Sequence, residues 1–80
     1  MRGIVDYIKD NDFKMIVLDK KININNYTNI LSMTDNRISL ISKIGRIIIK
    51  GQDLSVKKLL NNEILIEGNI FTIEIGDKNV

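Results

Sequence analysis

The chain has 80 residues, of which 44% are hydrophobic and 28% are charged, and its formal net charge is +2. Cysteine and histidine are both absent, which excludes disulfides, thiolate zinc sites and imidazole ligands. A chain of this length forms one domain whose core supplies little stability by itself. We therefore expect a single small domain, without metal or cofactor, that relies on good packing or on self-association.

Residues 1–12 are expected to form an N-terminal arm or a short helix. Ile4, Val5 and Ile8 recur at helical spacing, but so short a helix is not stable unless it docks on the rest of the protein. The acids Asp6 and Asp10 interrupt the apolar residues, which argues against a signal peptide. No segment reaches the ~18 apolar residues that span a bilayer. These features predict a soluble, cytoplasmic protein with no direct membrane insertion.

From residue 13 onward, short apolar segments alternate with polar breaks that contain Gly, Asn or Asp. Ile22 and Ile24, for example, alternate with asparagines, which is the period-2 pattern of a half-buried strand. We expect an all-β domain over residues 13–76, with a tail at 77–80: a small antiparallel meander that forms a barrel or sandwich of about six to eight short strands. The expected strands are 13–18, 22–25, 30–33, 37–41, 46–50, 54–57, 63–67 and 70–75.

Three residues are expected to set turns: Gly51, Gly68 and Asn29. Gly68 followed by Asn69 is a signal for a two-residue hairpin with positive φ. Just beyond it, the apolar alternation slips in phase at Phe71, which predicts a β-bulge or a change of partner. The predicted core consists of Ile47, Ile49, Leu54, Val56, Ile64, Ile66, Phe71 and Ile73.

Several strands are apolar on both faces. Ile48 and Leu65 should face water if their neighbours face the core, yet strands of this kind are usually covered on both sides. Ile41 and Ile70 are also apolar on the presumed outer face. We expect a homodimer whose interface contains Ile48, Leu65, Ile41 and Ile70. Cover by the N-terminal segment is the alternative.

Positive charges crowd the middle of the chain, and negative charges dominate its end. One interpretation is that adjacent strands place opposite charges across from one another as exposed pairs. Complementary charges between subunits are a second interpretation. The third is a small basic β-barrel that binds nucleic acid, although no aromatic residue for base stacking lies between Arg37 and Lys58. Its basic patch would consist of Arg37, Arg46, Lys50 and Lys57.

The sequence contains no recognisable reaction centre. Without Cys or His, the usual nucleophile–base pairs cannot be built. Glu63 and Glu67 share one face of a strand at a separation of ~13 Å, which is wider than the carboxylate pairs of glycosidases. The glycines form no phosphate-binding loop. We therefore expect a protein that is not an enzyme and has no catalytic, cofactor-binding or metal-binding residues.

Three segments together resemble the YabP/YqfC family of bacterial sporulation proteins, and the YqfC branch most closely. They are residues 47–57 (IIIKGQDLSVK), 63–70 (EILIEGNI) and 24–31 (INNYTNIL). The ordered combination of Gly51, the Glu67-Gly68 step and the Asn26-Tyr27 turn carries the similarity. Asn25 stands where the family usually has Glu, and Asn29 where it usually has Gly.

This resemblance implies a role in endospore formation. Members of the family are small, non-catalytic proteins of the mother cell, often encoded beside a membrane protein, and they bring no catalytic residues to carry over. The implied function is a scaffold or accessory subunit that acts through protein–protein interaction. A membrane protein encoded nearby is the implied partner in addition to a second copy of the chain.

Overall fold

The computed structural model describes residues 12–77, so the predicted arm at 1–12 and tail at 77–80 lie almost entirely outside the described residues. The all-β prediction is confirmed, with six strands in the described range and no helix among them. The strands are β1 (Lys14–Leu18), β2 (Lys21–Asn25), β3 (Asn29–Met33), β4 (Arg37–Ser42), β5 (Gly45–Leu59) and β6 (Glu63–Gly76).

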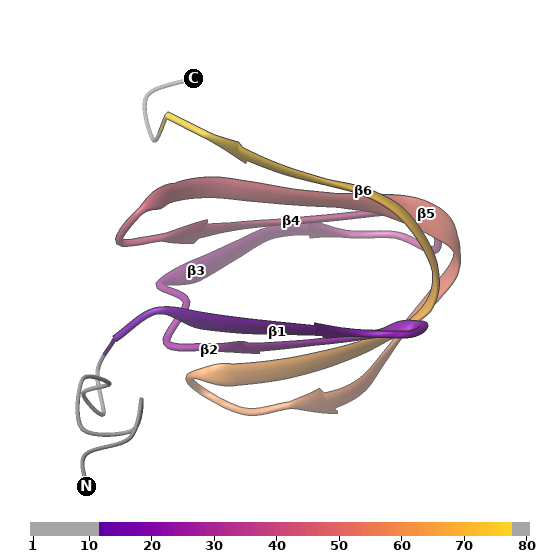
Figure 1. Ribbon diagram of the computed structural model, residues 1–80. Coiled ribbons are helices and arrows are strands. Elements are labelled where there is room, and N and C mark those ends of the chain that lie inside the picture. The colour runs from indigo at the N-terminus through magenta and orange to yellow at the C-terminus, as the bar shows by residue number, and fades with distance from the viewer. Residues whose placement is uncertain (1–11, 78–80) are drawn as a thin grey trace, which may run out of the picture.

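All six strands belong to one antiparallel sheet in the order β1-β2-β6-β5-β4-β3. The two central strands are long, with 15 residues in β5 and 14 in β6, and both curve so strongly that the sheet folds back on itself (Figure 1). The upper layer contains β3, β4, residues 45–50 of β5 and residues 72–76 of β6. The lower layer contains β1, β2, residues 63–67 of β6 and residues 55–59 of β5. The result is an open sandwich whose layers share two strands.

Two glycines allow the central strands to bend. A Cβ on Gly51 would lie 2.1 Å from the carbonyl oxygen of Asn69, and one on Gly68 would lie 2.7 Å from that of Asp53. Gly68 also has a φ of 146°, a conformation that favours glycine. The hairpin predicted at Gly68 and Asn69 is wrong, as is the break at Gly51, because both strands continue through these positions. Positive φ bends β6 here without reversing the chain.

The phase slip near Phe71 is a β-bulge, as the apolar pattern predicts. Lys50 pairs with Thr72 and Gly51 with Ile70, so Phe71 has no partner on β5. A bulge re-aims the side chain of its extra residue. Phe71 is 66% exposed, and its predicted place in the core is wrong.

A second local correction concerns the turn before β3. Asn29 is the first residue of β3 and does not set the predicted turn; the positive φ in the connection before β3 is at Asn26, whose φ is 66°. Asparagine tolerates a positive φ because its short polar side chain bonds locally.

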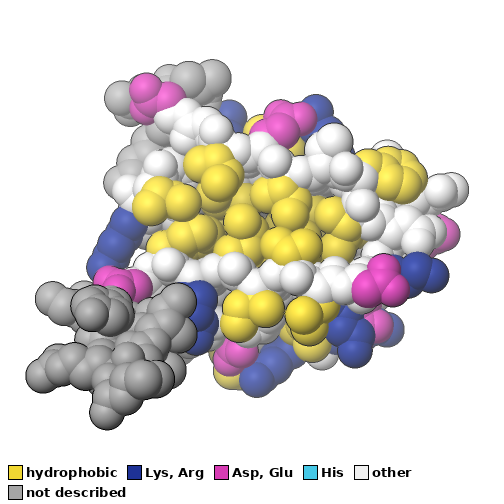
Figure 2. All heavy atoms as spheres, viewed as in Figure 1, with side chains coloured by type: hydrophobic (Ala, Val, Ile, Leu, Met, Phe, Trp, Pro, Cys, Tyr) yellow, Lys and Arg dark blue, Asp and Glu magenta, His cyan; other side chains and the backbone are white. Residues whose placement is uncertain are grey.

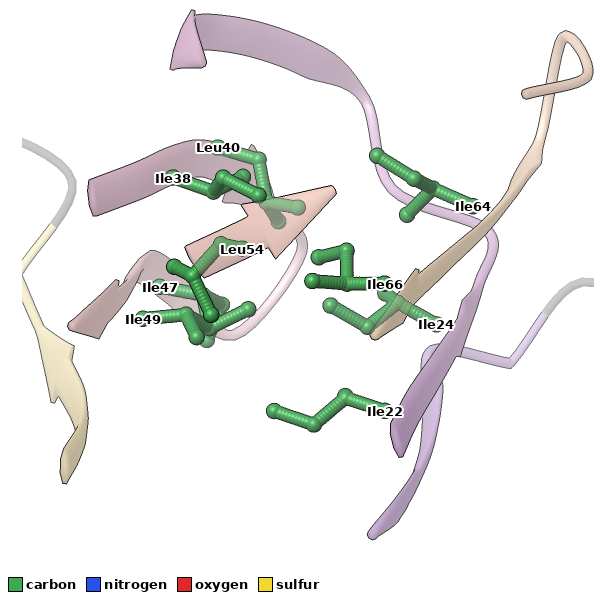
Figure 3. Packing of buried hydrophobic residues seen from close by; sticks show 9 residues of the cluster. All are labelled: Ile22, Ile24, Ile38, Leu40, Ile47, Ile49, Leu54, Ile64 and Ile66. Carbon is green, nitrogen blue, oxygen red and sulfur yellow. The ribbon is translucent and has the colours of Figure 1, made fainter. Parts of the chain in front are cut away.

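The core lies between the two layers (Figure 3). In the lower layer, isoleucines of β2 and β6 point toward isoleucine and leucine side chains of β4 and β5, and Leu54 closes the bend. Of the predicted core, Val56 and Ile73 pack against this cluster while half-buried, and the remaining members apart from Phe71 are buried. Full burial of each such side chain contributes about 1.5–3 kcal/mol. The buried apolar residues are Ile22, Ile24, Ile38, Leu40, Ile47, Ile49, Leu54, Ile64 and Ile66.

Candidate interaction surface

One long side of the sandwich, between β3 and residues 55–59 of β5, is bridged at both ends. Near the bend, Leu54 N donates to Asp35 O at 2.7 Å. At the other end, the connection from β2 to β3 crosses between the layers, and Tyr27 Oη donates to Leu60 O at 2.6 Å. The next residue is held to the upper layer, because Thr28 N donates to Ile41 O at 2.8 Å. We call this the bridged side.

The opposite long side lies between β1 and residues 72–76 of β6. These two segments are the edges of their layers and are not neighbours in the sheet. They approach each other at the bend, where residues 17–20 and 69–71 line a common hollow, and they diverge toward the other end (Figure 1). We call the space between them the β1–β6 opening and define it by Met15, Val17, Ile73 and Ile75.

The residues of the β1–β6 opening continue the core to the surface. Residues directly opposite in neighbouring strands share a face. Val17 is opposite the fully buried Ile22, and Ile75 is opposite the fully buried Ile47. Val17 is nevertheless 52% exposed and Ile75 56% exposed. Apolar side chains gather in the middle of this face between the two layers (Figure 2).

Further exposed apolar residues border the opening. Ile16 and Leu18 lie on the outer face of β1, and Phe71 lies at the bulge of β6. Within residues 12–77, β1 and the last part of β6 thus hold half of the exposed large apolar side chains. A contiguous apolar surface of this kind typically marks an interaction site. These five residues are Ile16, Val17, Leu18, Phe71 and Ile75.

The interface residues predicted from sequence do not form one surface. Ile48 and Ile41 lie on the outer face of the upper layer, and Leu65 lies on the outer face of the lower layer. Ile70 packs against the core at the bend. All four are half-buried by their neighbours. The apolar surface that remains exposed is at the sheet edges, which alternation within a strand does not identify, although β1 is apolar on both faces from Met15 to Leu18.

The predicted basic patch is also divided. Arg37 and Lys50 are cross-strand partners, and Arg46 shares their outer face of the upper layer, where its buried Nε has no hydrogen-bond partner among the described residues. Lys57 lies in the lower layer. The charge of Lys50 is offset by Glu74, whose Oε2 is 3.1 Å from Lys50 Nζ. The structure therefore brings together three of the four residues, one of them already paired.

Glu63 is held in its ionised form by neighbouring polar groups. Asn23 Nδ2 donates to Glu63 Oε2 at 3.1 Å, and Lys58 Nζ lies 3.4 Å from Oε1. The hydrogen bond from Asn23, followed by the bond and charge of Lys58, lowers the pKa of the Glu63 carboxyl from its ordinary value, against a smaller opposing effect of desolvation. Like Lys50 with Glu74, Lys58 with Glu63 joins the neighbouring strands β5 and β6, although the Glu63 side chain is only 22% exposed.

Within residues 12–77, no group of three or more Asp or Glu side chains could hold a metal ion. No helix in that range is long and apolar enough to cross a bilayer. A hollow of about 780 Å³ lies outside Tyr27 on the bridged side, between residues 27–30 and residues 59–62, and it is open to solvent.

The fold defines a class: a small all-β protein made of one antiparallel sheet that is bent into a sandwich with an open apolar edge. The model of the YabP family matches residues 11–80, nearly the whole chain, and the chain belongs to this family. The family resemblance noted in the sequence is thereby confirmed for the family as a whole, and membership associates the chain with sporulation. No curated protein and no solved structure matches it significantly.

Proposed function

We propose that this protein acts in endospore formation by binding another protein chain at the β1–β6 opening, as a non-catalytic scaffold or accessory subunit in the cytoplasm of the mother cell. The observation that supports this most directly is that the apolar interior reaches the surface between two edge strands. Membership of the YabP family supplies the biological setting.

The chemistry of the opening suits a protein partner. An edge strand offers main-chain N–H and C=O groups that another extended chain can pair with. The half-exposed side chains beside it contribute further when they are covered, at about 25 cal/mol per Å² of apolar surface. A nucleic acid would instead require positive charge and stacking aromatics, and the opening is lined by Met, Val and Ile.

A matched pair of substitutions tests the proposal in a spore-forming strain that carries the altered chain in place of its own. Ile75→Lys places a charge in the opening, whereas Ile44→Lys changes a residue of nearly equal exposure, 55%, in the turn between β4 and β5. We expect Ile75→Lys to reduce heat-resistant spores at least tenfold and Ile44→Lys to leave them unchanged. Thermal unfolding of both purified variants shows that each one folds. Normal sporulation with a folded Ile75→Lys variant would refute the proposal.

The basic-barrel alternative has its own test. Mixed oligonucleotides are titrated into the protein at low salt, with fluorescence anisotropy as the readout. We expect no binding, because the basic residues are divided between layers and Lys50 is paired with Glu74. Binding that weakens steeply as salt rises would favour nucleic-acid recognition instead.

A further inference from the structure

We propose that the occupant of the β1–β6 opening is a second copy of this chain. The two copies are related by a twofold axis parallel to the strands, so that β1 of each copy pairs with the C-terminal part of β6 of the other. This inference rests on the proposed function, since it names the partner at the same surface. Four features of the molecule support it: main-chain direction, side-chain register, charge and the wedge shape of the opening.

The first feature is the direction of the main-chain groups in β1. In an antiparallel ladder, alternate residue pairs exchange both of their main-chain hydrogen bonds. The N–H and C=O groups of successive residues in a strand therefore point to the neighbouring strands on opposite sides. Gly68 N donates to Lys20 O and Asn26 N to Asn62 O, which directs the even-numbered residues of β2 toward β6. The odd-numbered residues of β2 then face β1. In the register of β1 with β2, this leaves the main-chain groups of Met15 and Val17 at the free edge.

The main-chain groups of residues 72–76 in β6 alternate in the same way. Thr34 N donates to Arg37 O, which directs Arg37 toward β3 and the even-numbered residues of β4 toward β5. The pairing of β4 with β5, and of residues 46–50 with 72–76, is regular. Thr72 and Glu74 therefore bond to β5, and the main-chain groups of Ile73 and Ile75 point to the free edge. On both edges, the residues with free main-chain groups are those whose side chains face inward.

Charge selects one register between the two edges. An antiparallel pairing that aligns the inner faces can place Met15 opposite Ile73 of the second copy, which puts Lys14 opposite Glu74 on the outer face. A shift of two residues places Glu74 opposite Ile16 and loses this charge pair. Opposite charges and apolar pairs directly across from one another are each favourable, so the register with Lys14 opposite Glu74 is preferred.

The wedge shape of the opening is consistent with this register. At the bend, Val17, Leu18, Ile70 and Phe71 of one chain are among the residues that line a common hollow, so the end of β1 lies beside residues 70 and 71. A twofold axis along the strands keeps each residue at its level, and it therefore brings the end of β1 beside residues 70 and 71 of the second copy. The register with Lys14 opposite Glu74 does this, since it places Val17 opposite Phe71 and Leu18 opposite Ile70. This axis also matches the wide end of one opening to the wide end of the other, which an axis perpendicular to the layers does not (Figure 1).

In the resulting dimer, each layer continues into the other layer of the second copy. The arrangement uses each open edge once, closes under twofold symmetry and leaves no apolar edge at the opening for further growth. The side chains that it covers include the exposed inward-facing ones of the opening, Val17 and Ile75.

Disulfide cross-linking tests the register, because the chain has no cysteine of its own. Lys14 and Glu74 of the second copy would be a non-hydrogen-bonded pair, with Cα atoms about 4.5 Å apart, which is within the range that a disulfide bridges. Lys14→Cys/Glu74→Cys and Ile16→Cys/Thr72→Cys should each give a covalent dimer under mild oxidation. The same four positions supply the controls in the shifted registers, Lys14→Cys/Thr72→Cys and Ile16→Cys/Glu74→Cys. These should give at least tenfold less dimer.

Light scattering on the unmodified full chain completes the test, and we expect the molar mass of a dimer. Equal cross-linking in all four variants would overturn the proposed register. A disulfide within one chain would overturn the dimer, since β1 and β6 would then close on each other. A dimer dissociated by Ile48→Lys/Leu65→Lys, without specific cross-linking, would place the contact on the sheet faces instead.

The two proposals fail in different ways. A monomer in solution, combined with spore loss in the Ile75→Lys strain, overturns only the second copy as occupant and leaves the opening as the binding surface for another protein. A cross-linked dimer combined with normal sporulation of Ile75→Lys overturns the proposed function and leaves the dimer standing.

Discussion

The two long sides of the sandwich differ in how the two layers are joined and in how well the apolar interior is covered. On the bridged side, the connection after β2 crosses between the layers, and hydrogen bonds from Tyr27 and Leu54 join them at both ends. On the open side, β1 and residues 72–76 approach each other only at the bend, and Val17 and Ile75 remain about half exposed. Within residues 12–77, the chain passes between the layers only once outside the bend, and the side without that crossing stays open.

This contrast shows that connectivity decides where apolar surface remains. Inward-facing isoleucines line both layers, and those on strand segments with a neighbour on each side are fully buried. Beside the opening, the same residue type is exposed because its strand has a neighbour on one side only. Binding surfaces of small β proteins can therefore be sought at the edge strands of the sheet.

The largest expected effect on the free energy of unfolding comes from truncating a core residue, and it should exceed that of truncating a residue of the β1–β6 opening. Ile66→Ala should lower the free energy of unfolding by about 2–5 kcal/mol, because Ile66 is fully buried between the layers and its truncation leaves a cavity. Ile75→Ala should cost less, and its cost should depend on protein concentration, because Ile75 gains cover only in the dimer. Urea denaturation at several protein concentrations measures both. Equal losses that do not vary with concentration would contradict the distinction.

The next effect concerns the bend that brings both sides together. Gly68→Ala should lower the free energy of unfolding by about 1–3 kcal/mol, because a side chain is strained at its φ of 146° and its Cβ would crowd Asp53 O. Gly76→Ala is the control, since a Cβ at that position meets nothing within 4 Å. Thermal unfolding of the two variants should differ clearly. A harmless Gly68→Ala would mean that the bend tolerates a side chain.

A smaller effect is expected on the bridged side. Tyr27→Phe removes the hydroxyl that donates to Leu60 O at 2.6 Å and should cost about 0.5–1.5 kcal/mol. Because the bridge holds that end of the sandwich together, amide hydrogen exchange should accelerate in residues 26–30 and 59–62 and stay unchanged in β1. Faster exchange spread evenly over the chain would indicate global destabilisation and argue against a local bridge.

The smallest effect is electrostatic. The pKa of Glu63 is lower in the folded chain than in the unfolded one, so the unfolded state takes up a proton first as the pH falls. The resulting stabilisation is present at neutral pH and is lost progressively below the ordinary glutamate value of about 4.3. Glu63→Gln should flatten this part of the stability curve between pH 5 and the acid limit. An unchanged acid slope would show that Asn23 and Lys58 do not hold the carboxylate in solution.

Local pattern was enough to predict most of the strand segments and five of the nine buried apolar residues, although it divided β5 and β6 into two strands each. Alternation such as that of Ile22 and Ile24 reports burial directly, because side chains of a strand alternate between its faces. The phase slip at Phe71 predicted the bulge for the same reason. The exposure of Phe71 itself is not predicted, because a bulge changes which way a side chain points. The apolar pattern assumes that side chains alternate between the two faces without interruption.

The sequence by itself determined an antiparallel all-β fold, its apolar core and the positions that require glycine. The tertiary structure alone decided whether Gly68 would reverse the chain or bend it, since a positive φ serves both outcomes. It also decided which strands became edges. Edges depend on pairings between residues far apart in the chain, such as Ile22 with Ile66, and the proposed interaction surface at Val17 and Ile75 arises from that long-range order.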